Sequence, residues 1–218
     1  MKNFISTFFC TTVLMLMFVV GVGAQGLSPL QRIDIDEPTG SNFCTAFSIN
    51  AKEGYWISAS HCFSLPFDVY IAGEKINWTM DFDQDLDLIV FAGPKADGEY
   101  RLAKRSPTVG DEVKMVGYLG SQSASRLIPP PRPTGLTTVF GRIAALNHNT
   151  DETIMVRWPV LDLYDMSCGG GMSGSPILDA RGEAVGVLVG GQTISPYFCG
   201  SPPFEKLKEF GKLFWRIR

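Results

Sequence analysis

The chain has 218 residues, of which 45% are hydrophobic and 19% are charged, and its formal net charge is −3. This composition is typical of a globular protein, and the length suits one domain or two small fused lobes. A chain of this length can bury a hydrophobic core that is stable without additional cross-links. No basic stripe stands out in the main body, so we expect no nucleic acid as a partner.

The first 24 residues have the pattern of an export signal. Lys2 is followed by an apolar stretch over residues 13–20 and by the small residues 21–24, which predicts a secretory signal peptide over 1–24, cleaved before Gln25. The alternative is a membrane anchor, but the uninterrupted apolar core is shorter than the ~20 residues of a spanning helix. We therefore expect a secreted or periplasmic protein without a stable membrane span after cleavage.

Short strands separated by polar turns follow the signal segment. They fall into two series, over residues 43–49, 55–59, 67–71, 75–80 and 86–91, and then over 112–118, 137–146, 153–158, 175–178 and 183–189. No long helical pattern interrupts them, so a parallel sheet is not expected and an all-β sandwich or pair of barrels is.

The two series define the predicted organisation of the chain. Residues 25–92 form the first lobe, 93–110 a polar connection and 111–202 the second lobe. Residues 128–135 are rich in proline and predict an exposed loop, with a docking motif as the alternative.

The last segment, 203–218, is the only good helical pattern. Its apolar residues fall at helical spacing and are Phe204, Leu207, Phe210, Phe214 and Ile217. We expect this stripe to pack on the second lobe rather than on a membrane surface.

The cysteines also indicate an oxidising compartment. Cys10 lies in the signal segment, which leaves Cys44, Cys62, Cys168 and Cys199. An even number of cysteines behind an export signal indicates disulfides, although four cysteines allow three connectivities. The chain has no C-x-x-C pair and only two histidines, so we expect neither a zinc site nor another cofactor.

Two local motifs point to nucleophilic catalysis. Residues 169–176 read GGGMSGSP, in which glycines flank Ser173 and a β-rich run follows it. A serine hydroxyl needs a nearby base and a site that stabilises an oxyanion, and glycines allow backbone amides to converge on one point. Gly171 and Ser173 are the candidate amide donors, whereas the alternative is a plain glycine-rich turn.

The candidate base is His61, in the motif SASHC over residues 58–62, directly after an apolar strand. The other histidine, His148, lies in a polar loop sequence and is not a candidate.

These motifs resemble the chymotrypsin/trypsin-like superfamily of serine peptidases. The resemblance rests on residues 44–49 (CTAFSI), 58–62 (SASHC), 85–88 (DLDL), 171–176 (GMSGSP) and 186–191 (GVLVGG), in the family's order of His, Asp and Ser. Residues 109–118 look like the compact bacterial trypsin-like branch, and the similarity spans about 40–200.

The resemblance implies an all-β fold of two antiparallel six-stranded β-barrels with the active site between them. It implies His61 as the base, Ser173 as the nucleophile and the amides of Gly171 and Ser173 as the oxyanion hole. It also implies disulfides Cys44–Cys62 and Cys168–Cys199, and substrate-binding positions at Ser167, Val189 and Gly191.

The third catalytic position has two candidates. The family pattern is an aspartate followed by apolar strand residues, which Asp87 fits because residues 88–91 read LIVF. Asp85 would place a charge at a normally apolar position, so Asp87 is preferred over Asp85. The expected function is thus a secreted serine endopeptidase, acting as a monomer on protein or peptide substrates; the alternative is a catalytically inactive binding module on the same scaffold.

Two positions depart from the family pattern. Met172 stands where trypsin-like enzymes often carry the aspartate that meets a newly cut N-terminus, so we expect no activation by that salt bridge. No acidic residue lies at the expected base of the specificity pocket, unless the loop shifts Asp165 there, so a large apolar side chain is expected in preference to Arg or Lys.

Overall fold

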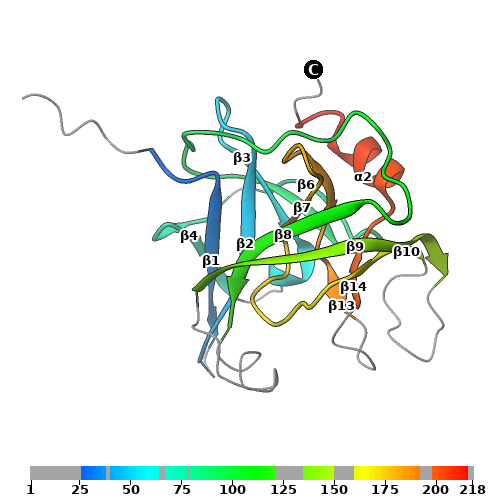
Figure 1. The fold of residues 1–218 in the computed structure, drawn as a ribbon. Helices are drawn as coiled ribbons and strands as arrows, with labels where there is room; N and C mark the ends of the chain where they lie inside the picture. The colour runs from blue at the N-terminus through cyan, green and yellow to red at the C-terminus, as the bar shows by residue number, and fades with distance from the viewer. Residues whose placement is uncertain are drawn as a thin grey trace, which may run out of the picture.

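The structure, a computed structural model, describes residues 26–37, 40–63, 67–77, 79–120, 135–149, 160–191 and 198–215. Its strands form two antiparallel sheets, one from each half of the chain, followed by a helix (Figure 1). This confirms the predicted all-β class with a C-terminal helix. The predicted signal peptide, the proline-rich residues 128–134 and the predicted strand 153–158 lie outside the described residues. In the described part of the chain, no helix has the length and apolar character needed to cross a membrane.

The first sheet curls into a barrel. Its strands are β1 (Leu30–Glu37), β2 (Gly40–Asn50), β3 (Tyr55–Ala59), β4 (Asp68–Ile71), β5 (Glu74–Lys75), β6 (Thr79–Asp83) and β7 (Leu88–Ala92). They pair in the order β5-β4-β1-β2-β3-β7-β6, all antiparallel. Because β5 and β6 stand at opposite ends of this order yet are separated in the chain only by residues 76–78, the sheet has to bend round on itself.

The second sheet closes in the same way. Its strands are β8 (Glu112–Leu119), β9 (Gly135–Asn149), β10 (Val160–Asp165), β11 (Pro176–Leu178), β12 (Ala184–Val187), β13 (Gly190–Gly191) and β14 (Phe198–Ser201). They pair in the order β12-β11-β8-β9-β10-β14-β13. Only Leu188 and Val189 separate β12 from β13, which lie at the two ends, so this short segment closes the barrel. Each sheet thus has seven strands, one more than the expected six. The additional strand is the two-residue β5 in the first sheet and the two-residue β13 in the second, each at one end of its sheet.

The connection between the lobes belongs to both of them. The amide of Tyr100 donates to the Ser48 carbonyl of β2 at 2.8 Å, and the amide of Ala103 donates to the Ala184 carbonyl of β12 at 2.9 Å. The segment predicted as a polar linker is therefore hydrogen-bonded to a strand of each sheet.

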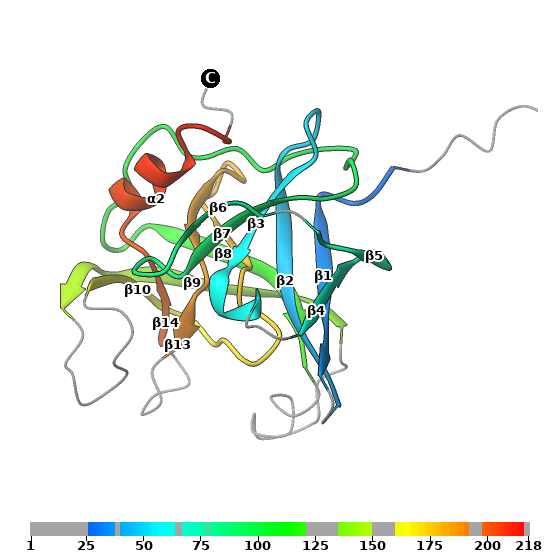
Figure 2. The ribbon, with the colours of Figure 1, turned by 180° about the vertical axis from the view of Figure 1, so that it is seen from behind.

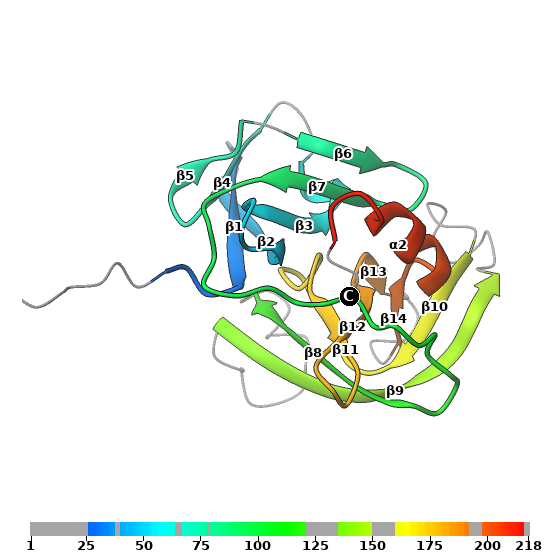
Figure 3. The same ribbon diagram turned by 90° about the horizontal axis from the view of Figure 1, so that it is seen from above.

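The C-terminal helix, α2 (Phe204–Gly211), also reaches both lobes. Phe204 and Leu207 are buried, and the helix contacts β12 of the second sheet, as expected. The helix ends before its predicted boundary, however, and the chain after it runs back over the strands of the first lobe (Figure 3). The ring of Phe214 lies 5.7 Å from that of Tyr55, and the ring of Trp215 lies 5.6 Å from that of Phe47. The prediction that the whole stripe packs on the second lobe is wrong for Phe214, because the chain turns after Gly211; Trp215 was not part of the predicted stripe.

Candidate active site

His61 lies in a tight turn at the end of a buried strand. The 3-10 turn η1 (Ser60–Phe63) follows β3 and lies between the two sheets (Figure 2). A disulfide from Cys44 of β2 to Cys62 holds the turn against the first sheet. The His61 side chain is 28% exposed, so its ring is partly buried and partly accessible to solvent.

Asp87 lies directly against this histidine. Its Oδ2 is 2.5 Å from His61 Nδ1, and its Oδ1 accepts hydrogen bonds from the His61 amide at 2.8 Å and the Ser60 hydroxyl at 2.7 Å. The residue is 3% exposed. A proton on Nδ1 shared with this carboxylate leaves Nε2 as the nitrogen that can accept a proton, which is the tautomer a general base needs.

The other candidate, Asp85, does not reach the histidine. It is exposed, and its amide donates to Asp83 Oδ1 at 2.9 Å within a turn. The structure therefore brings Asp87, and not Asp85, together with His61.

The Ser173 loop is docked on the first lobe beside the histidine turn. The amide of Thr45, next to Cys44, donates to the Ser173 carbonyl at 2.8 Å. Gly174 has φ +83°, and a Cβ there would overlap the Thr45 carbonyl and the Ser58 hydroxyl and would lie 3.1 Å from the Ala59 amide nitrogen. Because Ser58 and Ala59 directly precede the turn that carries His61, the loop and the turn share one region between the sheets.

The backbone of this loop leaves two amides available. Met172 N donates to the Gly169 carbonyl at 3.1 Å and Gly174 N donates to the Leu188 carbonyl at 2.7 Å. Within the described part of the chain, no hydrogen bond is donated by the amides of Gly171 and Ser173. Two such donors can stabilise a developing oxyanion.

Gly171 has no room for a side chain. It has φ +88°, a conformation that favours glycine, and a Cβ there would overlap the ring of Phe43. The positive φ and the lack of space explain why residue 171, a candidate amide donor from the sequence, is a glycine.

The three expected substrate-binding positions come together through the second disulfide. Cys168, next to Ser167, bonds to Cys199, which pairs with Gly191 across β13 and β14. Val189 is buried and its amide donates to the Gly200 carbonyl at 3.0 Å. Asp165 is exposed at the end of β10.

Two further residues belong to this region and were not singled out by the sequence. The Ser60 hydroxyl holds Asp87, as described above, and the Thr45 hydroxyl donates to the Gly171 carbonyl at 2.9 Å. Both lie inside the quoted motifs, SASHC and CTAFSI, but the motifs gave these two residues no role.

Other candidate sites are less suited to chemistry. One ligand atom each from Cys44, His61 and Cys62 lies within 4.8 Å of the others, but the two sulfurs are bonded to each other and offer no thiolate to a metal. A pocket of about 530 Å³ in the second lobe is lined in part by Asp111 and Arg181.

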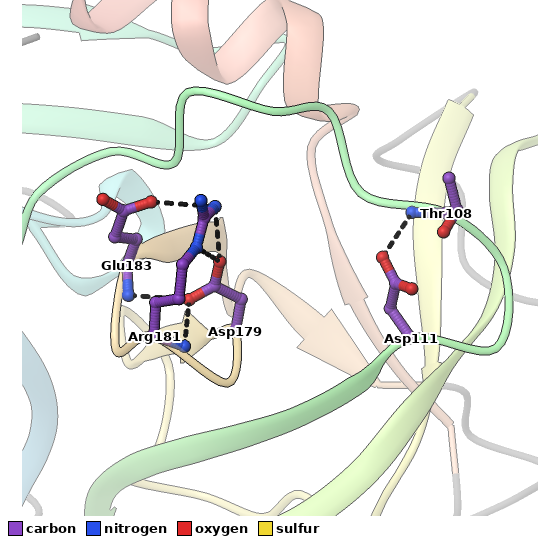
Figure 4. Close-up of polar contacts among 5 residues, drawn as sticks. All are labelled: Thr108, Asp111, Asp179, Arg181 and Glu183. Carbon is purple, nitrogen blue, oxygen red and sulfur yellow. Dashed lines mark hydrogen bonds and ion pairs between the residues drawn. The ribbon is translucent and has the colours of Figure 1, made fainter.

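Several charged residues around that pocket have partners within the protein. Figure 4 shows Arg181 held by Asp179 and Glu183, and Asp111 accepting a hydrogen bond from the Thr108 amide. That hydrogen bond lowers the pKa of Asp111, and the hydrogen bond to Asp179 raises the pKa of Arg181. None of the candidate catalytic residues lines this pocket.

Comparisons with known proteins agree with this geometry. Residues 44–187 match the family model of the trypsin-like peptidase domain. The active form of the Rv3671c protease from M. tuberculosis is similar in structure, with a TM-score of 0.63 at 19% identity, over 90% of this chain and 85% of that one. An HtrA-type protease, AlgW with a tripeptide, has a TM-score of 0.63 at 18% identity, over 85% of this chain and 59% of that one.

A serine endoprotease from Yersinia pestis has a TM-score of 0.59 at 15% identity, over 85% of this chain and 62% of that one. No match was found among the curated proteins. At these identities the structural likeness supports the fold, while the family model covers most of the chain. The chain belongs to the trypsin-like peptidase family.

Proposed function

We propose that the protein is a secreted serine endopeptidase that cleaves peptide bonds through Ser173, His61 and Asp87. The observation that carries the proposal is the buried Asp87 carboxylate on Nδ1 of His61, at 2.5 Å, beside the loop that contains Ser173. A histidine oriented by a carboxylate next to a glycine-flanked serine is the arrangement that activates a hydroxyl nucleophile.

In this proposal each group has a defined role. The Ser173 hydroxyl attacks the substrate carbonyl and His61 Nε2 takes its proton, while Asp87 stabilises the imidazolium that forms. The amides of Gly171 and Ser173 bind the oxyanion of the tetrahedral intermediate. His61 then protonates the leaving amine, and a water activated by the same histidine releases the acyl-enzyme.

The expected substrate is an extended peptide with a large apolar side chain on the acyl side of the cleaved bond. Ser167, Val189 and Gly191 form the proposed wall, and glycine at 191 leaves room for such a side chain. Asp165 is exposed at a strand end, which argues against the shift that would favour Arg or Lys.

Two observations support export. The structure forms both disulfides, which persist in oxidising compartments and are rare in reducing ones. The pattern of residues 1–24 is that of a signal peptide. A secreted or periplasmic location agrees with both.

The test is covalent labelling with a fluorophosphonate probe, followed by a peptide-library cleavage assay. Wild-type protein is expected to label at one site, and Ser173→Ala is expected to lose labelling and to lower kcat by about 10⁶-fold. Ser175→Ala is the matched control, because this buried serine lies two residues away and is expected to leave labelling intact.

The result also separates the two candidate functions. Labelling that survives Ser173→Ala would refute the nucleophile. A folded wild-type protein that neither labels nor cleaves would instead favour the inactive binding module.

A further inference from the structure

Every carbonyl of the nucleophile loop from 170 to 173 accepts a hydrogen bond. The pairs, donor first, are Gly120 N to Gly170 O at 2.9 Å, Thr45 Oγ1 to Gly171 O at 2.9 Å, Ser175 N to Met172 O at 2.9 Å, and Thr45 N to Ser173 O at 2.8 Å. Thr45 supplies two of these four donors, and its hydroxyl is the only side-chain donor among them.

The direction of these carbonyls sets the direction of the oxyanion-hole amides. A trans peptide unit is planar, so its N–H points opposite to its C=O. The bond on the Gly170 carbonyl therefore aims the Gly171 N–H, and the bond on the Met172 carbonyl aims the Ser173 N–H. Thr45 holds the peptide units that follow Gly171 and Ser173, so it limits rotation of the same stretch of backbone.

The Thr45 hydroxyl also connects the loop to strand β8. Its oxygen accepts a hydrogen bond from the Tyr118 amide of β8 at 3.0 Å while it donates to the Gly171 carbonyl. Thr45 itself belongs to β2 of the first lobe and is fully buried. Consecutive hydrogen bonds of this kind polarise and strengthen one another.

The surroundings are closely packed, so water does not replace this hydroxyl easily. A Cβ on Gly117 would overlap the Ser175 hydroxyl and would lie 3.2 Å from Thr45 Oγ1, and the ring of Phe43 fills the space beside Gly171. Loss of the hydroxyl would leave the Tyr118 amide and the Gly171 carbonyl, both in part-buried hydrogen bonds, without this partner.

We propose that Thr45 is a positioning residue of the oxyanion hole, whose hydroxyl couples β8 of the second lobe to the Gly171 peptide. This role rests on the proposed peptidase function. Thr45 touches no reacting atom; it acts by fixing the Gly171–Met172 peptide unit, which lies between the units that carry the Gly171 and Ser173 amides.

The test compares Thr45→Val and Thr45→Ala, which lack the hydroxyl, with Thr45→Ser, which keeps it. Loss of one oxyanion-hole donor costs about 10²–10³ in kcat, and a misaimed donor costs less, so we expect the first two variants to lose about 10- to 100-fold in kcat with little change in KM. Thr45→Ser is expected to stay within about three-fold of wild type, because it can form both hydrogen bonds.

A second readout isolates the oxyanion hole from general damage. A peptide aldehyde forms a tetrahedral adduct that uses the hole, whereas a cleaved product peptide does not. The inhibition constant of the aldehyde should rise by the same factor as kcat/KM falls in Thr45→Val, while that of the product peptide stays constant. All rates are taken per active site titrated with the fluorophosphonate probe, so that unfolded protein is not counted.

The control is Ser48→Ala, which removes from the same strand a buried hydroxyl that has no hydrogen-bond partner in the described part of the chain. It is expected to retain wild-type kcat and aldehyde affinity. A Ser173-dependent wild-type peptidase whose Thr45→Val variant keeps its kcat and aldehyde affinity per titrated site would overturn the role of Thr45 alone. A wild-type protein without Ser173-dependent cleavage would overturn the proposed function, and the role of Thr45 with it.

Discussion

Asp87 accepts hydrogen bonds from both the ring and the amide of the same histidine. The Ser60 hydroxyl adds a third, so the carboxylate is fixed in position although it is almost fully buried. Asp87 also has φ +53°, in the left-handed region that few non-glycine residues adopt. Backbone strain of this kind collects at functional sites, where the surrounding structure maintains it.

The first prediction concerns this carboxylate. Asp87→Asn should lower kcat/KM for a peptide substrate by about 10⁴-fold, because the amide group favours the wrong tautomer of His61. Asp85→Asn is the matched control, since Asp85 is exposed and should leave kcat/KM within about two-fold of wild type. Equal losses in the two variants, measured in one fluorogenic peptide assay, would contradict the assignment.

For single residues, the sequence predicted which side chains carry the chemistry better than it predicted which groups those side chains contact. The positions of His61 and Ser173 stand out because short motifs surround them. The choice between Asp87 and Asp85 depends on which of these two aspartates is buried against His61. Tertiary contacts decide this, and the local sequence does not show them. Thr45 belongs to a quoted motif, but its role could not be predicted, because the carbonyl it binds lies 126 residues further along the chain.

Helix α2 receives its N-terminal cap from a distant strand. Pro203 precedes the helix and offers no side-chain cap, whereas Asp162 of β10 accepts a hydrogen bond from the Phe204 amide at 2.8 Å. The other oxygen of Asp162 accepts from the Asn147 amide at 2.8 Å. Burial raises the pKa of Asp162, against the opposing effect of these two hydrogen bonds.

The second prediction follows from the direction of that pKa shift. The folded protein holds the proton of Asp162 more tightly than the unfolded chain, so the contribution of Asp162 to the free energy of unfolding is fully present below the unfolded pKa of about 4 and falls as pH rises through the raised folded pKa. Urea unfolding at several pH values should therefore show that the difference in the free energy of unfolding between wild type and Asp162→Asn becomes smaller as pH rises from about 4.

An asparagine side chain at position 162 can accept a hydrogen bond from only one of the two backbone amides. Its NH₂ group then faces the other amide, and neither of these two groups can accept. We therefore expect the variant to remain about 1–3 kcal/mol less stable than wild type even at neutral pH. A difference between wild type and variant that grows with rising pH would contradict the shift.

Two differences at the level of elements have physical causes. The helix was expected to continue to residue 217, whereas α2 ends at Gly211 and the rings of Phe214 and Trp215 pack on Tyr55 and Phe47. Strand β1 was not predicted, although the buried Ile33 and Ile35 alternate with charged neighbours as a half-buried strand requires.

The segment after α2 joins the two lobes of the molecule. Trp215 is 3% exposed, its ring lies against Phe47 of β2, and its Nε1 donates to the Tyr100 carbonyl of the inter-lobe connection at 2.7 Å. Tyr100 packs edge-on against the same Phe47, at 5.6 Å between ring centroids. Three segments far apart in the sequence therefore meet at one aromatic cluster, formed by Phe47, Tyr100 and Trp215.

The third prediction tests this aromatic cluster. Trp215→Ala should lower the free energy of unfolding by about 3–5 kcal/mol, because it removes a large buried ring and leaves a cavity between the lobes. Leu213→Ala is the control, since Leu213 is 82% exposed and should change stability by less than about 0.5 kcal/mol. Urea unfolding measures both, and similar values for the two variants would refute the structural role of Trp215.

For the whole molecule, the resemblance predicted two barrels, and the structure has them. The alternation of short strands was enough to divide the chain into two halves. It did not reveal how the halves are joined, because the contacts of Trp215 with Phe47 and Tyr100 form only after the chain has folded back on itself.

The position of Trp215 along the chain gives this cluster a consequence for biosynthesis. A ribosome makes the first lobe early, but the rings that cover Phe47 and Tyr55 are translated only after both barrels. A growing polypeptide therefore exposes that apolar surface until Phe214 and Trp215 have emerged. Nascent molecules that stop short of these residues would lack the contacts of Phe214 and Trp215 with the first lobe.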